Sequence, residues 1–309
     1  MKNDNLKSIS EIAREWHVSE RSVRNYCAQG RIADAELIGK IWYLPADAKK
    51  PSRKARCDQI PQTVAGLLKM EMESKLKGGL YHRLQVDFTY NTNHMEGSRL
   101  THEQTRWIFE TQTIGDLPAD IRLDDVYETT NHYRGFDKVI ASSGAQLTEA
   151  YIKDLHRILK TGTSDAAKAW FAVGDYKRLE NIVGDMETCP VKEVHREMAK
   201  LLKRYAASAK TFEDIVDFHV AFERIHPFQD GNGRVGRLIL LKECLKHGYT
   251  PFVIAENIKQ FYYLGLEDWR HGRRARLLDT CRTGQDVFAL GLRQFGHKRL
   301  AEKAEKELA

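Results

Sequence analysis

The sequence predicts a mostly α-helical protein with one β-hairpin, preceded by a small domain of two helices and two strands. Two observations support this fold class. Apolar residues recur every three or four positions through most of the chain after residue 58, which is the period of an amphipathic helix. The first 48 residues instead hold short elements separated by their own turn residues. At 309 residues and 42% hydrophobic content, the chain is long enough for one to three domains with a buried core.

The N-terminal domain is expected to span residues 1–48. Residues 10–16 predict a short helix capped by Ser10, and Ser19 caps a second helix that ends near Gly30. Residues 35–45 predict two short strands around a glycine. This arrangement is similar to the winged helix-turn-helix of MerR-like and excisionase-like proteins.

The winged helix-turn-helix resemblance implies that the second helix enters the major groove of duplex DNA and that the wing tip reaches a phosphate. The residues expected to contact DNA are Arg21, Ser22, Arg24, Asn25 and, at the wing tip, Lys40. Trp16, Val23 and Tyr26 are expected in the core of the domain. Small domains of this kind also dock onto proteins, and that alternative stays open.

The net charge of the chain is concentrated at its N-terminal end. Residues 1–56 hold 12 Lys and Arg against 7 Asp and Glu, a net charge of +5, whereas the remainder, with 37 against 36, carries only +1. Residues 49–59 form a basic, proline-containing linker. Because duplex DNA is an anionic partner, this asymmetry favours DNA binding by residues 1–56.

Residues 60–309 are expected to form a helical domain whose only sheet is one hairpin. The helical period is clearest in the segments 63–76, 81–95, 101–112 and 124–140.

Residues 226–237, His-Pro-Phe-Gln-Asp-Gly-Asn-Gly-Arg-Val-Gly-Arg, are the most informative stretch of the chain. Residues 211–226 predict an amphipathic helix that Pro227 stops. Glycines follow that allow unusual backbone angles, and a buried helix then begins. A loop that opens a helix turns free backbone N–H groups toward an anion such as phosphate.

The side chains of this stretch suit chemistry on a nucleoside triphosphate. Asp230 is a hard oxygen ligand that fits Mg²⁺ bridging phosphates. Arg234 and Arg237 lie on one helix face, and each can grip phosphate oxygens with two N–H groups. His226 can accept a proton from an attacking hydroxyl near neutral pH.

The stretch resembles the signature of the Fic family, His-x-Phe-x-(Asp/Glu)-Gly-Asn-Gly-Arg-x-x-Arg, at every position. The resemblance implies transfer of AMP from ATP, the co-substrate, to a Ser, Thr or Tyr hydroxyl of a target protein, with Mg²⁺ as cofactor. His226 would be the base and Asp230 the metal ligand. The phosphates would be bound by Gly231, Asn232 and Gly233 at the α-position and by Arg234 and Arg237 further out.

Two further segments extend the resemblance. Residues 147–162 resemble the helix that precedes the family's flap, and residues 174–184 resemble the flap, which aligns a target peptide by strand addition. An ordinary hairpin is the alternative for residues 174–184. Tyr263 falls where family members often place a tyrosine near the adenine, and packing in the core is its alternative.

Residues 92–97 fit the family's inhibitory pattern, (Ser/Thr)-x-x-x-Glu-(Gly/Asn), in a helix expected at about 81–97. The resemblance implies that Glu96 pairs with Arg237 in the place of the γ-phosphate and holds the enzyme inactive. The alternative is a surface glutamate at a helix C-terminus followed by a glycine cap.

Other features narrow the class of protein. The five cysteines are scattered without a Cys-x-x-Cys pair, which indicates reduced thiols rather than disulfides or a zinc site. The chain has no run of 18 apolar residues and no apolar signal segment, so we expect a cytoplasmic protein that does not contact a membrane.

Two other functions stay open, and so does formation of a homodimer. The chain could be a DNA-bound regulator that uses the nucleotide fold as a sensor or dimer platform. Within the family, the same site could remove AMP or transfer another nucleotidyl or phosphoryl group.

Overall fold

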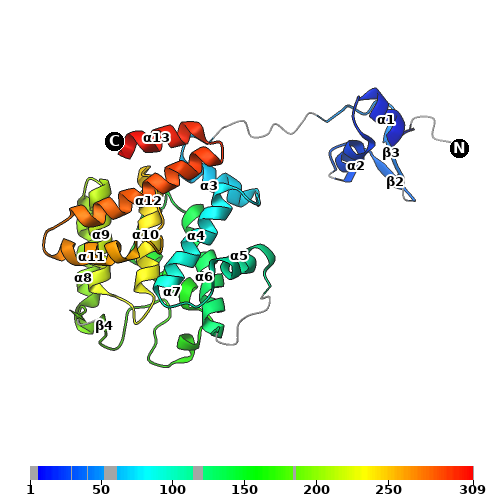
Figure 1. The fold of residues 1–309 in the computed structure, drawn as a ribbon. Coiled ribbons are helices and arrows are strands. Elements are labelled where there is room, and N and C mark those ends of the chain that lie inside the picture. Colours follow the sequence, from blue (N-terminus) through cyan, green and yellow to red (C-terminus); the bar gives the residue numbers. More distant parts are fainter. Residues whose placement is uncertain are drawn as a thin grey trace. The chain divides into compact units, whose positions relative to one another are not determined.

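The computed structural model describes residues 6–28, 30–39, 41–51, 61–113, 121–183 and 186–308. The chain divides into two compact units, Met1–Ile60 and Pro61–Ala309 (Figure 1). Across the described ranges, no helix is long and apolar enough to cross a membrane.

The N-terminal unit combines two helices with a three-stranded antiparallel sheet. Its elements are β1 (Leu6–Ser8), α1 (Ile9–Glu15), α2 (Glu20–Ala28), β2 (Glu36–Ile38) and β3 (Ile41–Pro45). Strand β3 lies between β1 and β2 in the sheet. The buried core consists of Ile9, Ile12, Ala13, Trp16, Val23, Cys27, Ile32 and Leu44, with Tyr26 partly buried against it.

The start of this unit differs from the sequence prediction. Helix α1 begins at Ile9 and is capped by Ser8 rather than Ser10, because the Ser8 hydroxyl accepts from the Glu11 N–H while the Glu11 carboxylate accepts from the Ser8 N–H. Strand β1 has no counterpart in the prediction, since three residues are too few to show an alternating pattern. The predicted wing-tip contact Lys40, and residues 52–59 of the predicted linker, lie outside the described residues.

The described residues of the C-terminal unit are helical apart from one short hairpin, which confirms the predicted mostly helical class for this part of the chain. Its elements are α3 (Val64–Glu73), α4 (Leu80–Met95), α5 (His102–Thr111), α6 (Leu123–Ala141), α7 (Glu149–Lys160), the 3₁₀ helix η1 (Ser164–Ala167), β4 (Ile182–Val183), β5 (Met186–Glu187), α8 (Val191–Ala207), α9 (Phe212–Ile225), α10 (Asn232–His247), α11 (Lys259–Arg270), α12 (Ala275–Gln294) and α13 (Lys298–Leu308).

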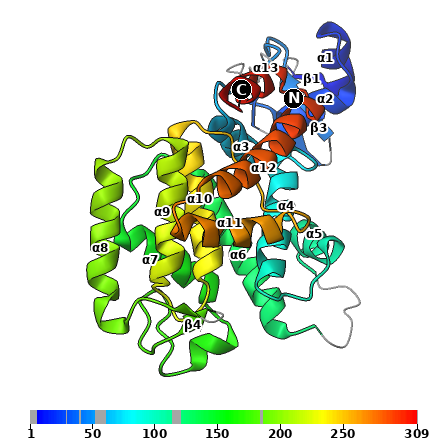
Figure 2. The ribbon, with the colours of Figure 1, turned by 60° about the vertical axis from the view of Figure 1, so that its left-hand side comes forward.

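Helix α10 is the centre of the C-terminal unit. It packs against α3, α4, α6, α7 and α9 (Figure 2), and residues 234–245 are buried without interruption. A helix that is buried on every side has no polar face to offer water. Its N-terminus is therefore held rigidly, and the residues there are positioned by the whole surrounding bundle.

Local sequence sets the turn from α9 into α10. Helix α9 ends at Ile225, the C-cap His226 has a left-handed backbone with φ of 51°, and Pro227 disfavours helical conformation in the residue before it. Gly231, with φ of 82°, precedes α10 in a conformation that is unstrained only without a Cβ atom. Residues 226–231 therefore form a compact loop at the N-terminus of the buried helix.

The hairpin pairs β4 with β5 in antiparallel register. Of the predicted flap at residues 174–184, only residues 182–183 are strand, residues 174–181 have no regular secondary structure, and residue 184 lies outside the described residues. Ile182 is exposed to 68%, so the hairpin turns an apolar side chain toward solvent.

Candidate active site

His226 lies at the junction between α9 and the loop. Its Nδ1 atom is 3.3 Å from the carbonyl oxygen of Glu223. Because a carbonyl only accepts hydrogen bonds, Nδ1 carries the proton and Nε2 keeps its lone pair. Burial lowers the pKa of His226 below its usual value, which keeps the ring neutral at physiological pH. His226 thus has the protonation state that a general base requires.

Asn232 fixes the shape of the loop. Its Oδ1 accepts from the Phe228 N–H at 2.8 Å, and its Nδ2 donates to the Phe228 carbonyl at 2.8 Å. The residue is only 1% exposed, so water does not compete for these bonds. The Asn232 amide therefore ties the start of α10 to the loop, beside Gly231 and Gly233.

His156, on α7, supports the loop from another side. Its ring stacks on Phe228, with centroids 4.0 Å apart and planes 4° from parallel. Its Nδ1 accepts from the Gly174 N–H at 3.0 Å, so Nε2 carries the proton and donates to the Asp230 carbonyl at 3.2 Å. Burial lowers the pKa of His156 to about 3, and the ring stays neutral. His156 therefore joins the start of the predicted flap to the loop.

Asp230 is an ionised carboxylate held by two cations. Its Oδ2 contacts Lys160 Nζ at 2.7 Å and Arg234 Nη2 at 3.0 Å. Burial would raise the pKa of Asp230, but Arg234 and Lys160 outweigh it and hold that pKa well below its usual value. Such a carboxylate fits Mg²⁺ shared with phosphate oxygens. Within the described ranges, no group of three or more His, Cys, Asp or Glu side chains is arranged to hold a metal ion.

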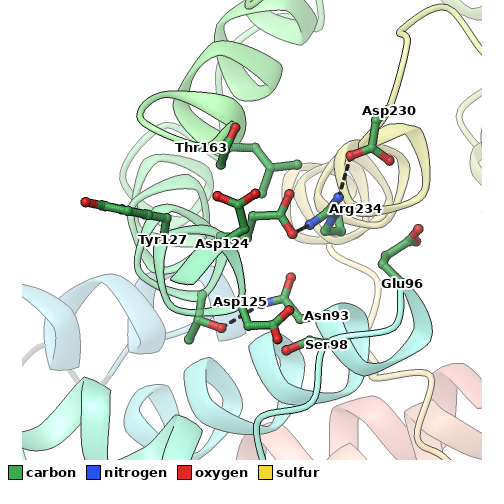
Figure 3. A network of polar contacts seen from close by, with 12 residues as sticks. Asn93, Glu96, Ser98, Asp124, Asp125, Tyr127, Thr163, Asp230 and Arg234 are labelled. Atoms are coloured by element: carbon green, nitrogen blue, oxygen red, sulfur yellow. Dashed lines mark hydrogen bonds and ion pairs between the residues drawn. The ribbon is translucent and has the colours of Figure 1, made fainter. Parts of the chain in front are cut away.

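Arg234 and Lys160 belong to one buried network of charges. Arg234, 2% exposed, contacts Glu128 of α6 as well as Asp230, and Figure 3 shows its guanidinium directed at the Asp230 carboxylate. Lys160, 1% exposed, contacts Glu128 at 2.6 Å and Asp165 of η1 at 2.8 Å in addition to Asp230. Both terminal nitrogens of Arg234 are therefore paired with protein carboxylates, whereas its buried Nε has no hydrogen-bond partner among the described residues.

Arg237 is paired with Glu96, the residue that ends α4. Its Nη2 lies 2.5 Å from Glu96 Oε1 and donates at 3.2 Å to the carbonyl of Thr92, whose hydroxyl accepts from Arg237 Nε. Arg237 is 5% exposed. Burial would lower the pKa of Arg237, but Glu96 outweighs it and the pKa is raised. The predicted proximity of Glu96 and Arg237 is therefore present in the structure.

The Glu96 carboxylate also lies against the first turn of α10. A Cβ atom built on Gly233 would collide with Glu96 Oε1 and would come within 2.8 Å of Arg237 Nη1. Only glycine leaves room for the carboxylate at this place. Because backbone N–H groups and the dipole favour an anion at a helix N-terminus, Glu96 is the anion that occupies this position here.

Tyr263, on α11, is 46% exposed. Partial burial raises the pKa of its phenol, and Arg237 and Glu96 are the next strongest influences on it, so the ring is close to the charged site. The core position beside it is taken by Tyr262, which is 1% exposed and whose hydroxyl lies 2.7 Å from His219 Nε2. Tyr262 is therefore the tyrosine that packs in the core, and Tyr263 lies outside the core.

Sequence reasoning missed three residues of the site: His156, Lys160 and Glu128. His156 and Lys160 are four residues apart on the buried face of α7. A histidine and a lysine among leucines on one helix face were the available signal. Glu128 carries no comparable signal, because acidic residues are ordinary on a helix such as α6.

The predicted DNA contacts of the N-terminal unit lie on α2. Arg21, Arg24 and Asn25 are exposed and Ser22 is partly exposed. Arg24 forms an exposed ion pair with Glu20 at 2.8 Å, a contact that contributes little and leaves the guanidinium accessible.

Residues 146–244 match the family model described as the Fic/DOC family. The matched range contains α7, the hairpin, the loop and both arginines of α10.

Curated relatives match over a longer part of the chain. Protein adenylyltransferase Fic of Nematostella vectensis is 24% identical over 243 residues, which cover 77% of this chain and 51% of the relative. The protein of the same name from Drosophila ananassae is 30% identical over 188 residues, covering 56% of this chain and 35% of the relative. The chain thus spans about half the length of these relatives or less.

Two solved structures share the fold. A Fic domain containing signaling protein from Bacteroides thetaiotaomicron has a TM-score of 0.55 and 23% identity, covering 79% of this chain and 95% of that one. Fic-1 from C. elegans has a TM-score of 0.58 and 17% identity, covering 75% of this chain and 70% of that one. Fold and site together define a helical domain built around a helix N-terminus suited to anions. Residues 146–244 are therefore similar to the Fic/DOC family, and the two solved structures share the surrounding fold.

The Asn232 amide is expected to stabilise both the loop and the domain. Asn232→Ala leaves the buried Phe228 N–H unpaired and removes one of the two donors to the Phe228 carbonyl, which keeps Asn181 Nδ2, so it should lower the free energy of unfolding by about 1–3 kcal/mol. Urea denaturation measures this, with the exposed Asn257→Ala as a control that should change it by less than about 0.5 kcal/mol. Equal stability of the two variants would show that the loop does not depend on Asn232.

Proposed function

We propose that this protein transfers AMP from ATP, bound with Mg²⁺, to a hydroxyl side chain of a target protein and of itself. One observation carries the proposal: a neutral His226 ends the helix before a loop that bears the ionised Asp230 and opens a helix with two buried arginines. The names of the curated relatives, protein adenylyltransferase, support it.

In the proposed reaction, the target oxygen attacks the α-phosphorus as the bond to pyrophosphate breaks. Nε2 of His226 accepts the proton of that hydroxyl. The N–H groups at the start of α10, together with Arg234 and Arg237, hold phosphate oxygens. Asp230 would hold Mg²⁺, which neutralises phosphate charge when bound. Positioning and electrostatic stabilisation would supply most of the rate.

The predicted flap and Tyr263 complete the proposal on the substrate side. A target segment in extended conformation would pair with the backbone of residues 174–184, which tolerates varied target sequences. Its support is the link through His156 from Gly174 to the Asp230 carbonyl, which places the start of this segment beside the loop. Tyr263, half-exposed and near Arg237, would contact the adenine.

We propose that Glu96 restrains this activity. Its carboxylate pairs with Arg237 and occupies the anion position at Gly233. A γ-phosphate that binds Arg237 must first replace that carboxylate, because two anions repel each other in a partly buried site. While Glu96 stays in place, ATP would bind with its α-phosphate out of line for attack.

The exposed face of α2 supports a second function, binding of duplex DNA. The side chains of Arg21, Arg24 and Asn25 are all exposed on this short helix. It belongs to the part of the chain that carries nearly all of the net positive charge. Such a face would bring the enzyme to DNA without taking part in the transfer.

Loss of the base should abolish transfer. His226→Ala should reduce labelling of the protein and of lysate proteins by α-labelled ATP by about 10²–10⁴-fold, with ATP affinity within a few-fold of wild type. His271→Ala, which changes an exposed histidine, should label like wild type. Undiminished labelling by His226→Ala would refute the transferase proposal. If wild type adds no label but releases labelled AMP from a target that already carries it, AMP removal would be favoured instead.

Removal of the restraining carboxylate should activate the enzyme. Glu96→Gly should raise self-labelling by roughly 100-fold, because the in-line geometry is restored. Glu73→Gly, at the exposed end of α3, is the matched control and should leave the rate unchanged. The restraint is disproved if the two variants label alike at every ATP and Mg²⁺ concentration tested.

Binding to DNA should depend on salt and on the α2 arginines. In the full chain, Arg21→Ala combined with Arg24→Ala should reduce the slope of log affinity against log salt by about 2, because two phosphate contacts are lost. Arg196→Ala with Lys200→Ala, two exposed changes on α8, should keep the wild-type slope. A wild-type affinity that does not respond to salt would point to a protein-docking role.

A further inference from the structure

The ammonium group of Lys160 fills a place that three carboxylates surround. Glu128, Asp165 and Asp230 each present one oxygen to Lys160 Nζ, at 2.6, 2.8 and 2.7 Å. An ammonium has three N–H donors, so each donor has one carboxylate acceptor. The four residues come from α6, α7, η1 and the loop before α10, which places this cluster where the main elements of the site meet.

Carboxylate oxygens converging on one point are the usual surroundings of a divalent cation. They bind Mg²⁺ at about 2.0–2.1 Å, shorter than every distance around Lys160, and Ca²⁺ at about 2.3–2.6 Å, a range that only the shortest of these distances reaches. With the ammonium at their centre, the three carboxylates are not arranged to hold a metal ion, and no group that could do so is found among the described residues. The lysine takes the place of the ion.

The cluster is also balanced in charge without a metal. Its three carboxylates face three cations: Lys160, Arg234 and Lys168, which reaches the second Asp165 oxygen at 2.6 Å. A divalent ion would add charge to a balanced cluster. A triphosphate brings its own negative charge, and only then does the site gain from a metal ion.

We propose that Lys160 is a built-in cation that keeps divalent ions away from Asp230 in the nucleotide-free protein and so makes metal entry depend on the triphosphate. The second half of this statement rests on the proposed function, since it assumes that ATP binds at the loop. The first half rests on the Lys160 contacts alone.

Lys160 acts as a positioning residue in this proposal. Its ion pair and that of Arg234 both fall on Oδ2 of Asp230, so neither takes Oδ1. A metal ion that arrives with the triphosphate meets a carboxylate already ionised and fixed in orientation. Lys160 therefore prepares one ligand without touching the reacting atoms.

The direct test is binding of Mn²⁺, followed by electron paramagnetic resonance of the free ion. Nucleotide-free wild type should show no saturable binding below about 1 mM, whereas addition of a non-hydrolysable ATP analogue should produce it. Lys160→Ala removes the cation and opens the space. It should bind Mn²⁺ or Ca²⁺ without nucleotide at least about tenfold more tightly than wild type. Lys160→Met fills the space without charge and should not bind either ion.

The results of these binding experiments test the role of Lys160 separately from the proposed AMP transfer. Tight nucleotide-free binding by wild type, or equal binding by wild type and Lys160→Ala, would overturn the role of Lys160. If Lys160→Ala unfolds easily, Ca²⁺ should raise its melting temperature, and addition of Asp165→Asn should reduce that rise. A variant that Ca²⁺ does not stabilise also contradicts the proposal. These nucleotide-free measurements need no enzyme activity, so absence of AMP transfer would leave their result intact.

Discussion

The structure depends on the burial of two arginines on a helix that has no exposed face. Arg234 and Arg237 lie one turn apart on α10 and are 2% and 5% exposed. An unpaired guanidinium in such surroundings costs several kcal/mol, so each needs an anion close by. Helix α6 and the loop supply Glu128 and Asp230 for the first, and α4 supplies Glu96 for the second. The helices around α10 are therefore fixed in position by charge as well as by apolar packing.

Burial and neighbouring charges together decide which polar groups of this site are charged at neutral pH. It lowers the pKa of His226 and of His156, so both rings stay neutral while the lysine and arginines remain charged. For Lys160 and Arg234, neighbouring carboxylates outweigh the same effect of burial. The positive charge of the site thus comes from groups that do not exchange protons near neutral pH, and the group that would take the proton is kept uncharged.

Sequence patterns were sufficient to predict helices and turns whose conformation is decided by neighbouring residues in the chain. The helical period locates most helices, and Pro227 and Gly231 mark the turn from α9 into α10 because they restrict or free the backbone at single positions. The same reasoning misplaced the cap of α1, because the reciprocal hydrogen bonds between Ser8 and Glu11 make Ser8 the cap and Ser10 part of the helix.

Contacts between distant parts of the chain could not be read from spacing. Lys160 meets Glu128 and Asp230, which lie 32 and 70 residues away, and no periodicity relates them. Glu96 and Arg237 are 141 residues apart, and only the resemblance to a family indicated their pairing. Tertiary packing decides which of many ordinary acidic residues meets a buried cation, so these partners become visible only in the folded structure.

The position of Glu96 at the end of α4 has a consequence for how firmly it is held. The carboxyl end of a helix carries partial negative charge, so α4 disfavours a carboxylate there by about 0.3–1 kcal/mol, while the amino end of α10 favours it. The two helices act in opposite directions on one side chain. The charge of Arg237 decides the balance, because it holds the pKa of Glu96 below its usual value despite burial, so Glu96 is kept in place by α10 and not by its own helix.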